Sequence, residues 1–136
     1  ELKRNVVIHQ RVALKPTLEI FEQYASRVRG QFHCFVDDVA SMQRVVELGS
    51  LISFTGILTF KNAKDVRETL AATPEDRFML ETDSPFLAPV PYRGKRCEPA
   101  YVKEIAAIAA EVRGCSLEKL SGETCATARD FFKGLN

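Results

Sequence analysis

The sequence predicts an α/β fold in which helices cover a parallel sheet. Three observations predict it: short apolar runs alternate with segments of helical spacing, the connections between them are short, and the runs are apolar on both faces. Such strand–helix repeats are typical of right-handed βαβ units, and doubly apolar strands are typical of parallel sheets. We expect one domain over residues 1–136, a length sufficient for a substantial core.

Four strands are predicted, each as an apolar run bounded by polar residues. They cover residues 6–9, 31–35, 51–54 with a continuation near 57–60, and 78–82. Helices are predicted at residues 17–27, 39–48, 63–72, 100–112 and 117–132. The first helix is amphipathic, with one face formed by Leu18, Phe21, Tyr24 and Ala25. Gly49 is predicted to end the second helix, and Ser116 is predicted to cap the start of the last one.

The stretch from residue 84 to residue 99 contains four prolines, which predicts an extended loop after the last strand. Loops of this kind often carry function.

Composition excludes several classes of protein. Hydrophobic residues make up 46% and charged residues 27%, which is typical of a globular domain and leaves no segment long and apolar enough for a membrane span. A net charge of +1 creates no broad basic surface, so a nucleic-acid substrate would be held locally. The four cysteines form no CxxC pair, which favours reduced thiols and a cytoplasmic location.

The chain's only two histidines, His9 and His33, stand at the carboxyl ends of predicted strands, and Asp83 ends the last strand. Catalytic groups collect at this edge of parallel α/β folds. Two imidazoles and a carboxylate suit Zn²⁺ or Mn²⁺, and Mg²⁺ with softer geometry. The alternative is that each histidine is an ordinary hydrogen-bonded structural residue. Glu81 shares the face of Asp83, either near the site or in an ion pair, for example with Arg11.

Several segments, taken in order, resemble the successive signatures of the TatD family of metal-dependent deoxyribonucleases. They are Val-Ile-His-x-Arg at 7–11, Phe-His-Cys-Phe at 32–35, Ile-Ser-Phe-Thr-Gly-Ile-Leu-Thr-Phe-Lys-Asn-Ala at 52–63, Leu-Glu-Thr-Asp-Ser-Pro-Phe-Leu-Ala-Pro at 80–89, Tyr92-Arg93-Gly94-Lys95 and Glu98-Pro99. Each motif alone is weak, but together they span nearly the whole chain.

The resemblance implies the C-terminal half of a TIM-type (β/α)8 barrel, with these strands as the last four. It implies that His9, His33 and Asp83 are metal ligands, with Glu81 and Arg93 nearby. It also implies metal-assisted phosphodiester hydrolysis of DNA, in which Asp83 holds a metal ion or orients the attacking water.

The chain departs from the family pattern in ways that affect the site. The family's His-x-His pair and bridging Glu are absent, so the metal site is incomplete within this sequence. Val12 follows Arg11 where Arg-Asp-Ala is usual, and Thr127 stands where Asn-Ala is typical. The lack of an initiating Met before a strand-like run indicates a portion of a longer fold.

Arg11, Arg93 and Lys95 are candidate phosphate contacts, as are Lys61 and Arg96, although each also fits a solvated surface. A half barrel leaves two strand edges unpaired, so we expect a partner: a second copy, forming a homodimer, or the missing N-terminal half. Two other functions stay open. One is a catalytically silent module that oligomerises or binds a partner, and the other is hydrolysis of a substrate other than nucleic acid on the same scaffold.

Overall fold

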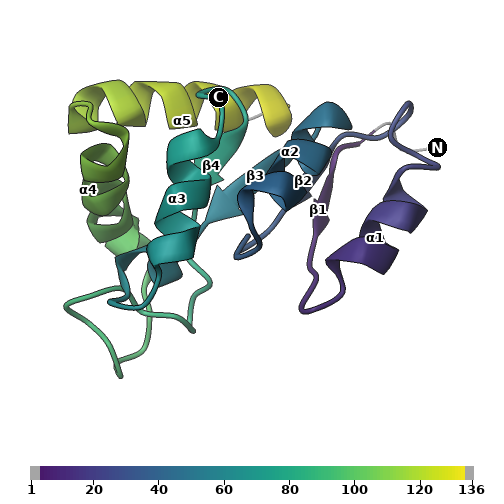
Figure 1. Ribbon diagram of the computed structural model, residues 1–136. Helices are drawn as coiled ribbons and strands as arrows, with labels where there is room; N and C mark the ends of the chain where they lie inside the picture. Colours follow the sequence, from purple (N-terminus) through teal and green to yellow (C-terminus); the bar gives the residue numbers. More distant parts are fainter. Residues whose placement is uncertain (1–3, 134–136) are drawn as a thin grey trace.

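The computed structural model describes residues 4–133 of the chain. Its centre is a four-stranded sheet in the order β1-β2-β3-β4, and every neighbouring pair is parallel (Figure 1). The strands are β1 (Val6–Ile8), β2 (Gly30–Phe32), β3 (Leu51–Phe54) and β4 (Phe78–Leu80). The predicted α/β class with four parallel strands is therefore confirmed, and all carboxyl ends meet at one edge of the sheet.

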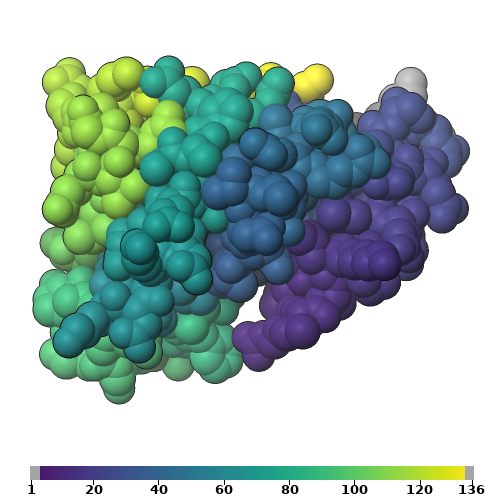
Figure 2. All heavy atoms as spheres, in the orientation of Figure 1, coloured from purple at the N-terminus to yellow at the C-terminus, as the bar shows by residue number. Residues whose placement is uncertain are grey.

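Helices follow every strand. The α-helices are α1 (Leu14–Phe21), α2 (Val39–Glu47), α3 (Lys64–Ala72), α4 (Val102–Arg113) and α5 (Leu117–Phe131), and the short 3-10 helices are η1 (Gly56–Thr59) and η2 (Pro99–Tyr101). The space-filling view shows the chain running across the molecule from α1 through α2 and α3 to α4, in sequence order (Figure 2). None of these helices, within the described residues, is long and apolar enough to cross a membrane.

Several predicted boundaries are wrong. The strands predicted at 31–35 and 78–82 end at Phe32 and Leu80. The first helix begins at Leu14 and ends at Phe21, rather than covering 17–27. Pro16 lies inside its first turn, where a missing backbone N–H costs no helical hydrogen bond. After Phe21 the backbone forms a tighter turn, in which the backbone N–H of Tyr24 donates to the Phe21 carbonyl three residues back. Tyr24 is therefore exposed rather than on the buried face.

The third strand does not continue near residues 57–60, where η1 forms instead. The reason is a close approach of two backbones. A Cβ atom on Gly56 would lie 2.1 Å from the Leu87 carbonyl oxygen, so only glycine fits here. The loop that follows β4 therefore packs directly on η1. The loop predicted over residues 84–99 is free of helix and strand as far as residue 98, and Pro99 begins η2.

The main core lies between the sheet and the helices α1 to α4. Its largest fully buried side chains include Phe32, Ile52, Phe54 and Phe78. On the other face of the sheet, Phe131 of α5 packs on Leu51 and Met79. Helix α5 crosses the sheet at the ends where its strands begin (Figure 1).

We call the face on which Phe131 packs the inner face of the sheet. Toward the carboxyl ends of the strands, this inner face is polar rather than apolar. The side chains of Gln31 and Ser53 are buried there, and the amide nitrogen of Gln31 donates to the Ser53 hydroxyl at 2.5 Å. The expectation that the strands are apolar on both faces is thus wrong near their carboxyl ends. The polar side chains of the site occupy that position.

The local signals at helix ends are confirmed. Gly49 follows α2 with a φ of +70°, and the Ser116 hydroxyl accepts a hydrogen bond from the Lys119 backbone N–H at 3.1 Å. All four cysteines are free thiols.

Candidate metal site

His9, His33 and Asp83 come together at the carboxyl edge of the sheet, just after β1, β2 and β4. The ring centroids of His9 and His33 are 5.8 Å apart, and His33 Nε2 lies 3.2 Å from Asp83 Oδ1. All three side chains line a pocket of about 250 Å³, together with Arg11. The structure thus gathers the three residues that sequence analysis selected as ligands.

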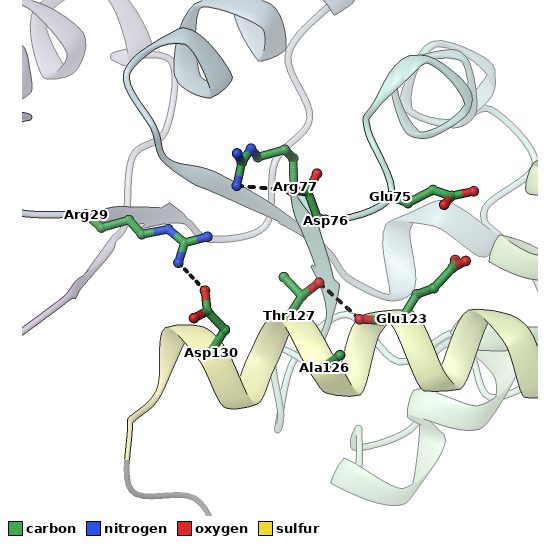
Figure 3. Close-up of a pocket in the computed structure, with 8 residues that line it drawn as sticks. All are labelled: Arg29, Glu75, Asp76, Arg77, Glu123, Ala126, Thr127 and Asp130. Atoms are coloured by element: carbon green, nitrogen blue, oxygen red, sulfur yellow. Dashed lines mark hydrogen bonds and ion pairs between the residues drawn. The ribbon is translucent and has the colours of Figure 1, made fainter.

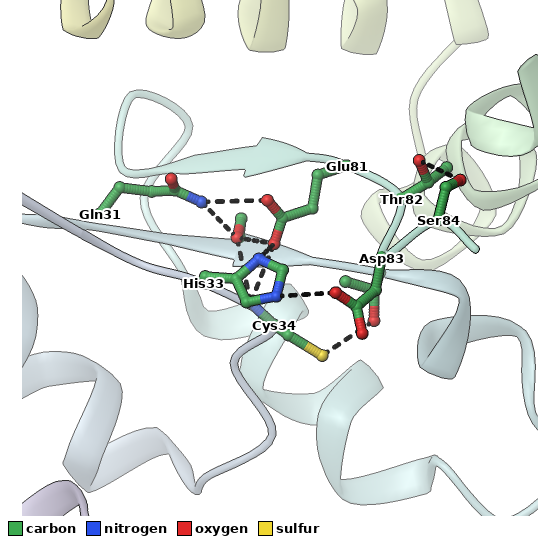
Figure 4. A network of polar contacts seen from close by, with 9 residues as sticks. Gln31, His33, Cys34, Glu81, Thr82, Asp83 and Ser84 are labelled. Carbon is green, nitrogen blue, oxygen red and sulfur yellow. Dashed lines mark hydrogen bonds and ion pairs between the residues drawn. The ribbon is translucent and has the colours of Figure 1, made fainter. Parts of the chain in front are cut away.

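His33 stands between two carboxylates (Figure 4). Its Nδ1 atom is 2.7 Å from Glu81 Oε1, while Nε2 faces Asp83. The His33 side chain is only 15% exposed, so the ring is held by its surroundings. In metal-binding histidines one ring nitrogen binds the metal and the other donates to a carboxylate or carbonyl, and Glu81 has the position of that supporting carboxylate.

Glu81 is held by several donors from β2 and β3. Its Oε1 accepts from the backbone N–H of Cys34 at 2.9 Å and from the Ser53 hydroxyl, and its Oε2 accepts from Gln31 Nε2 at 3.3 Å. The suggested ion pair of Glu81 with Arg11 is wrong, because the carboxylate faces inward to His33. The sequence signals for this role were its position two residues before Asp83 and its place in the Leu-Glu-Thr-Asp segment that resembles the TatD family.

Cys34 was not selected from the sequence, although it stands inside the Phe-His-Cys-Phe motif. Its φ of +50° is rare for a residue with a side chain, and this conformation accompanies the inward backbone donation to Glu81. The Cys34 sulfur lies 3.2 Å from the Thr55 hydroxyl. Burial is the main cause that raises the pKa of the Cys34 thiol, so it stays protonated at neutral pH.

The candidate phosphate contacts divide into two groups. Arg11 lines the pocket with the histidines. Arg93 does not, because its guanidinium stacks 3.7 Å over the Phe60 ring and donates to the Ala88 carbonyl at 3.3 Å. Lys95 also lies outside the pocket, with its ammonium 5.9 Å from the centre of the Tyr92 ring.

A second pocket of about 400 Å³ lies at the opposite end of the sheet, between α5 and the segments that precede β2 and β4 (Figure 3). Its walls are charged, and the charges are paired: Arg29 contacts Asp130 at 2.5 Å, and Arg77 contacts Asp76 at 3.4 Å. Thr127, at a position where the sequence departs from the TatD pattern, lines it as well. The Arg29–Asp130 pair joins α5 to the segment that precedes β2, and Lys119 of α5 pairs with Glu75 at 3.1 Å in the segment that precedes β4. These links indicate a structural role.

Residues 1–133 match the family described as TatD related DNase. The chain belongs to this family. Among curated TatD-like relatives, it is 42% identical over 125 residues to "Uncharacterized metal-dependent hydrolase YcfH" of Escherichia coli K12, covering 91% of this chain and 47% of that protein. It is 37% identical over 134 residues to "Uncharacterized metal-dependent hydrolase YabD" of Bacillus subtilis, covering 98% and 52%.

Solved structures show the same TatD fold. The crystal structure of YJJV, a TatD homolog from Escherichia coli K12, superposes with a TM-score of 0.87 at 22% identity, covering 94% of this chain and 49% of that one. A TatD family hydrolase from Entamoeba histolytica gives a TM-score of 0.82 at 18% identity, covering 93% and 50%. The chain therefore spans about half the length of the relatives it matches.

The donor set fits a divalent cation in chemistry but not in number. His33 Nε2 and Asp83 Oδ1 face one another, and an imidazole with a carboxylate suits Zn²⁺ and Mn²⁺. Within residues 4–133, however, no group of three or more His, Cys, Asp or Glu side chains is arranged to hold a metal ion.

Proposed function

We propose that this chain supplies part of the divalent-metal site of a TatD-type phosphodiester hydrolase that acts on DNA. The observation that carries the proposal is the row Glu81–His33–Asp83, in which one half-buried carboxylate holds a ring nitrogen and leaves the other nitrogen beside a second half-buried carboxylate at the carboxyl edge of the sheet. Family membership supports it, since the curated relatives bear the name metal-dependent hydrolase.

His33 through Nε2, Asp83 through its carboxylate and His9 through its ring would hold Zn²⁺, Mn²⁺ or Mg²⁺. A cation bound there supplies positive charge to the phosphoryl oxygen and activates water at neutral pH. Asp83 would hold the cation or orient the attacking water. Arg11 lies in the same pocket, where its guanidinium would contact the phosphate of the cleaved bond.

Arg93 and Lys95 would act farther from the cleaved bond. Both are exposed on the loop that leaves β4, and both already lie over aromatic rings. In this position they would contact flanking phosphates of the DNA strand, a sequence-independent interaction that weakens with salt.

A complementary half would complete the barrel and the ligand set. β1 is an edge strand in the described sheet, and its residue Val7 is 54% exposed, which is unusual for an apolar strand residue. We propose that four further strands cover this edge and supply the remaining ligands, either from another segment of polypeptide or from a second copy of this chain.

The alternative function is a catalytically silent module that binds a partner or oligomerises. The lack of a three-residue ligand cluster among residues 4–133 favours it over catalysis by this chain alone. In that case the exposed edge of β1 would be the binding surface.

Calorimetric titration with Mn²⁺ and Zn²⁺ separates these functions. If the proposal holds, the protein binds metal, His33→Ala abolishes binding, and the exposed Gln43→Ala on α2 leaves it unchanged as a control. Cleavage of single-stranded DNA, RNA and a simple phosphodiester in Mn²⁺ then defines the substrate. Failure of the protein to bind either metal would favour the silent module.

A further inference from the structure

We propose that Glu81 is the positioning residue of the metal site: it keeps the His33 proton on Nδ1, turns Nε2 toward the metal position and thereby sets metal affinity. This inference rests on the proposed function. It assigns to Glu81 a role distinct from that of the ligands, because Glu81 is not among the residues that line the pocket.

The two carboxylates beside His33 lie at different distances from its ring nitrogens. Glu81 Oε1 lies 2.7 Å from His33 Nδ1. His33 Nε2 also faces a carboxylate, but at the longer distance of 3.2 Å from Asp83 Oδ1. The shorter contact is the better acceptor for a ring N–H group, so Glu81 favours the proton on Nδ1. With the single proton of a neutral ring on Nδ1, Nε2 keeps its lone pair for a cation held between Nε2 and Asp83.

Glu81 is suited to this task because its own carboxylate is immobilised. The Gln31 amide of β2 and the Ser53 hydroxyl of β3 donate to it, as does the Cys34 backbone N–H just after β2. Gln31 and Ser53 are fully or nearly fully buried, and they also bond to each other. The orientation of His33 is thus built on the interior of the sheet rather than on a mobile surface side chain.

Glu81 does not take the place of a ligand. It and Asp83 contact different nitrogens of the same ring, and only Asp83 lines the pocket (Figure 4). The Glu81 oxygen nearest the ring already accepts from Cys34 and Ser53. Its effect on the metal ion is therefore exerted through His33.

The first test compares Mn²⁺ affinity, measured by calorimetry, of the wild type, Glu81→Gln, Glu81→Asp and the control Glu19→Gln. Glu81→Gln keeps the size of the side chain but weakens the acceptor, and Glu81→Asp keeps the charge but withdraws it by one methylene. Partners of metal-binding histidines typically change affinity by about 10- to 100-fold, and we expect both Glu81 variants to bind in that range more weakly. Glu19 is exposed on α1, so its variant should match the wild type.

The second test is spectroscopic and separates positioning from a merely structural role. In ¹⁵N-histidine NMR of the Cd²⁺-loaded wild type, we expect coupling of cadmium to His33 Nε2 and a proton on Nδ1. Glu81→Gln should change the Nδ1 signal while the thermal unfolding midpoint of the metal-free protein stays close to that of the wild type. The wild-type spectrum alone tests the proposal if the variants fail to fold.

The possible results are distinguishable. Cadmium coupling to Nδ1, or equal Mn²⁺ affinity of folded Glu81→Gln and the wild type, would overturn the role of Glu81 and leave the metal site standing. If the wild type binds neither Mn²⁺ nor Cd²⁺, the proposed function itself is wrong, and the effect of Glu81 on affinity falls with it.

Discussion

The guanidinium of Arg93 lies 3.7 Å over the ring of Phe60, and this contact fastens the proline-rich loop to the end of η1. Two residues expected to have separate roles, a phosphate contact and a strand residue, thus form one interaction. In the same loop, the backbone of Leu87 packs on Gly56. The loop that carries Asp83 is therefore held at two points.

Arg93→Ala should destabilise the protein by about 0.5 to 1 kcal/mol, the value of an exposed cation–π contact. Arg93→Lys should restore little of this, because an ammonium lacks the planar stacking surface and cannot reproduce the guanidinium geometry. Urea unfolding of both variants measures the loss. Adding Phe60→Leu to Arg93→Ala should cost almost no further unfolding free energy. Full additivity of the two losses would show that the two residues do not interact.

Phe131 and Phe132 are adjacent but differ in burial, which makes them a matched pair. Phe131 is 1% exposed against Leu51 and Met79, whereas Phe132 is 40% exposed. Phe131→Ala should cost about 3 to 5 kcal/mol of unfolding free energy, as expected for a buried aromatic residue. Phe132→Ala should cost far less. Denaturant titration checks both, and equal losses would mean that α5 does not close the inner face of the sheet as described.

The general architecture was predictable because it depends on local patterns. Apolar runs mark all four strands, and Gly49 and Ser116 mark helix ends through their own backbone preferences. The inner polar face was not predictable. Gln31 and Ser53 interrupt apolar runs singly, and only the parallel register of β2 and β3 brings them together beneath Glu81.

The ligand candidates were predictable from their position at strand ends, whereas their supports were not. Glu81 was close to Asp83 in sequence, but its contact with His33 joins residues 48 positions apart across the sheet. The position of Arg93 over Phe60 likewise depends on the path of a loop that has no periodic pattern. Such contacts arise from packing, which a single sequence does not display.

We expect the stability of the protein to depend on pH through Asp38, the N-cap residue of α2. Its carboxylate accepts a hydrogen bond from the Ser41 backbone N–H at 2.8 Å, and hydrogen bonds from Ser41 hold the pKa of Asp38 below its usual value. A lowered folded-state pKa stabilises the protein above the unfolded-state pKa of about 4, and the gain is lost as pH falls through the lower folded-state value.

Asp38→Asn should therefore remove part of the acid sensitivity while keeping an N-cap side chain. Thermal unfolding between neutral pH and about pH 3 should show the wild-type midpoint falling toward that of the variant below the usual Asp pKa near 4. Parallel curves for the two proteins over that range would contradict the cap as the cause.

Asp83 should contribute to metal binding and not to folding. In the metal-free protein, the carboxylates of Asp83 and Glu81 flank one imidazole, and the Asp83 side chain is 32% exposed. Removing one of two like charges relieves repulsion, so Asp83→Asn should leave the unfolding free energy in chelator unchanged within about 0.5 kcal/mol or raise it slightly. Residues that support a metal-binding histidine change metal affinity by roughly 10-fold or more when they are replaced. Asp83 is proposed as a ligand itself, so Asp83→Asn should lower Mn²⁺ affinity by more than that roughly 10-fold lower bound. Urea unfolding in EDTA and Mn²⁺ calorimetry on the same preparations measure both effects. A large loss of stability with unchanged affinity would instead make Asp83 a structural partner of His33, and the metal site would then have to lie elsewhere.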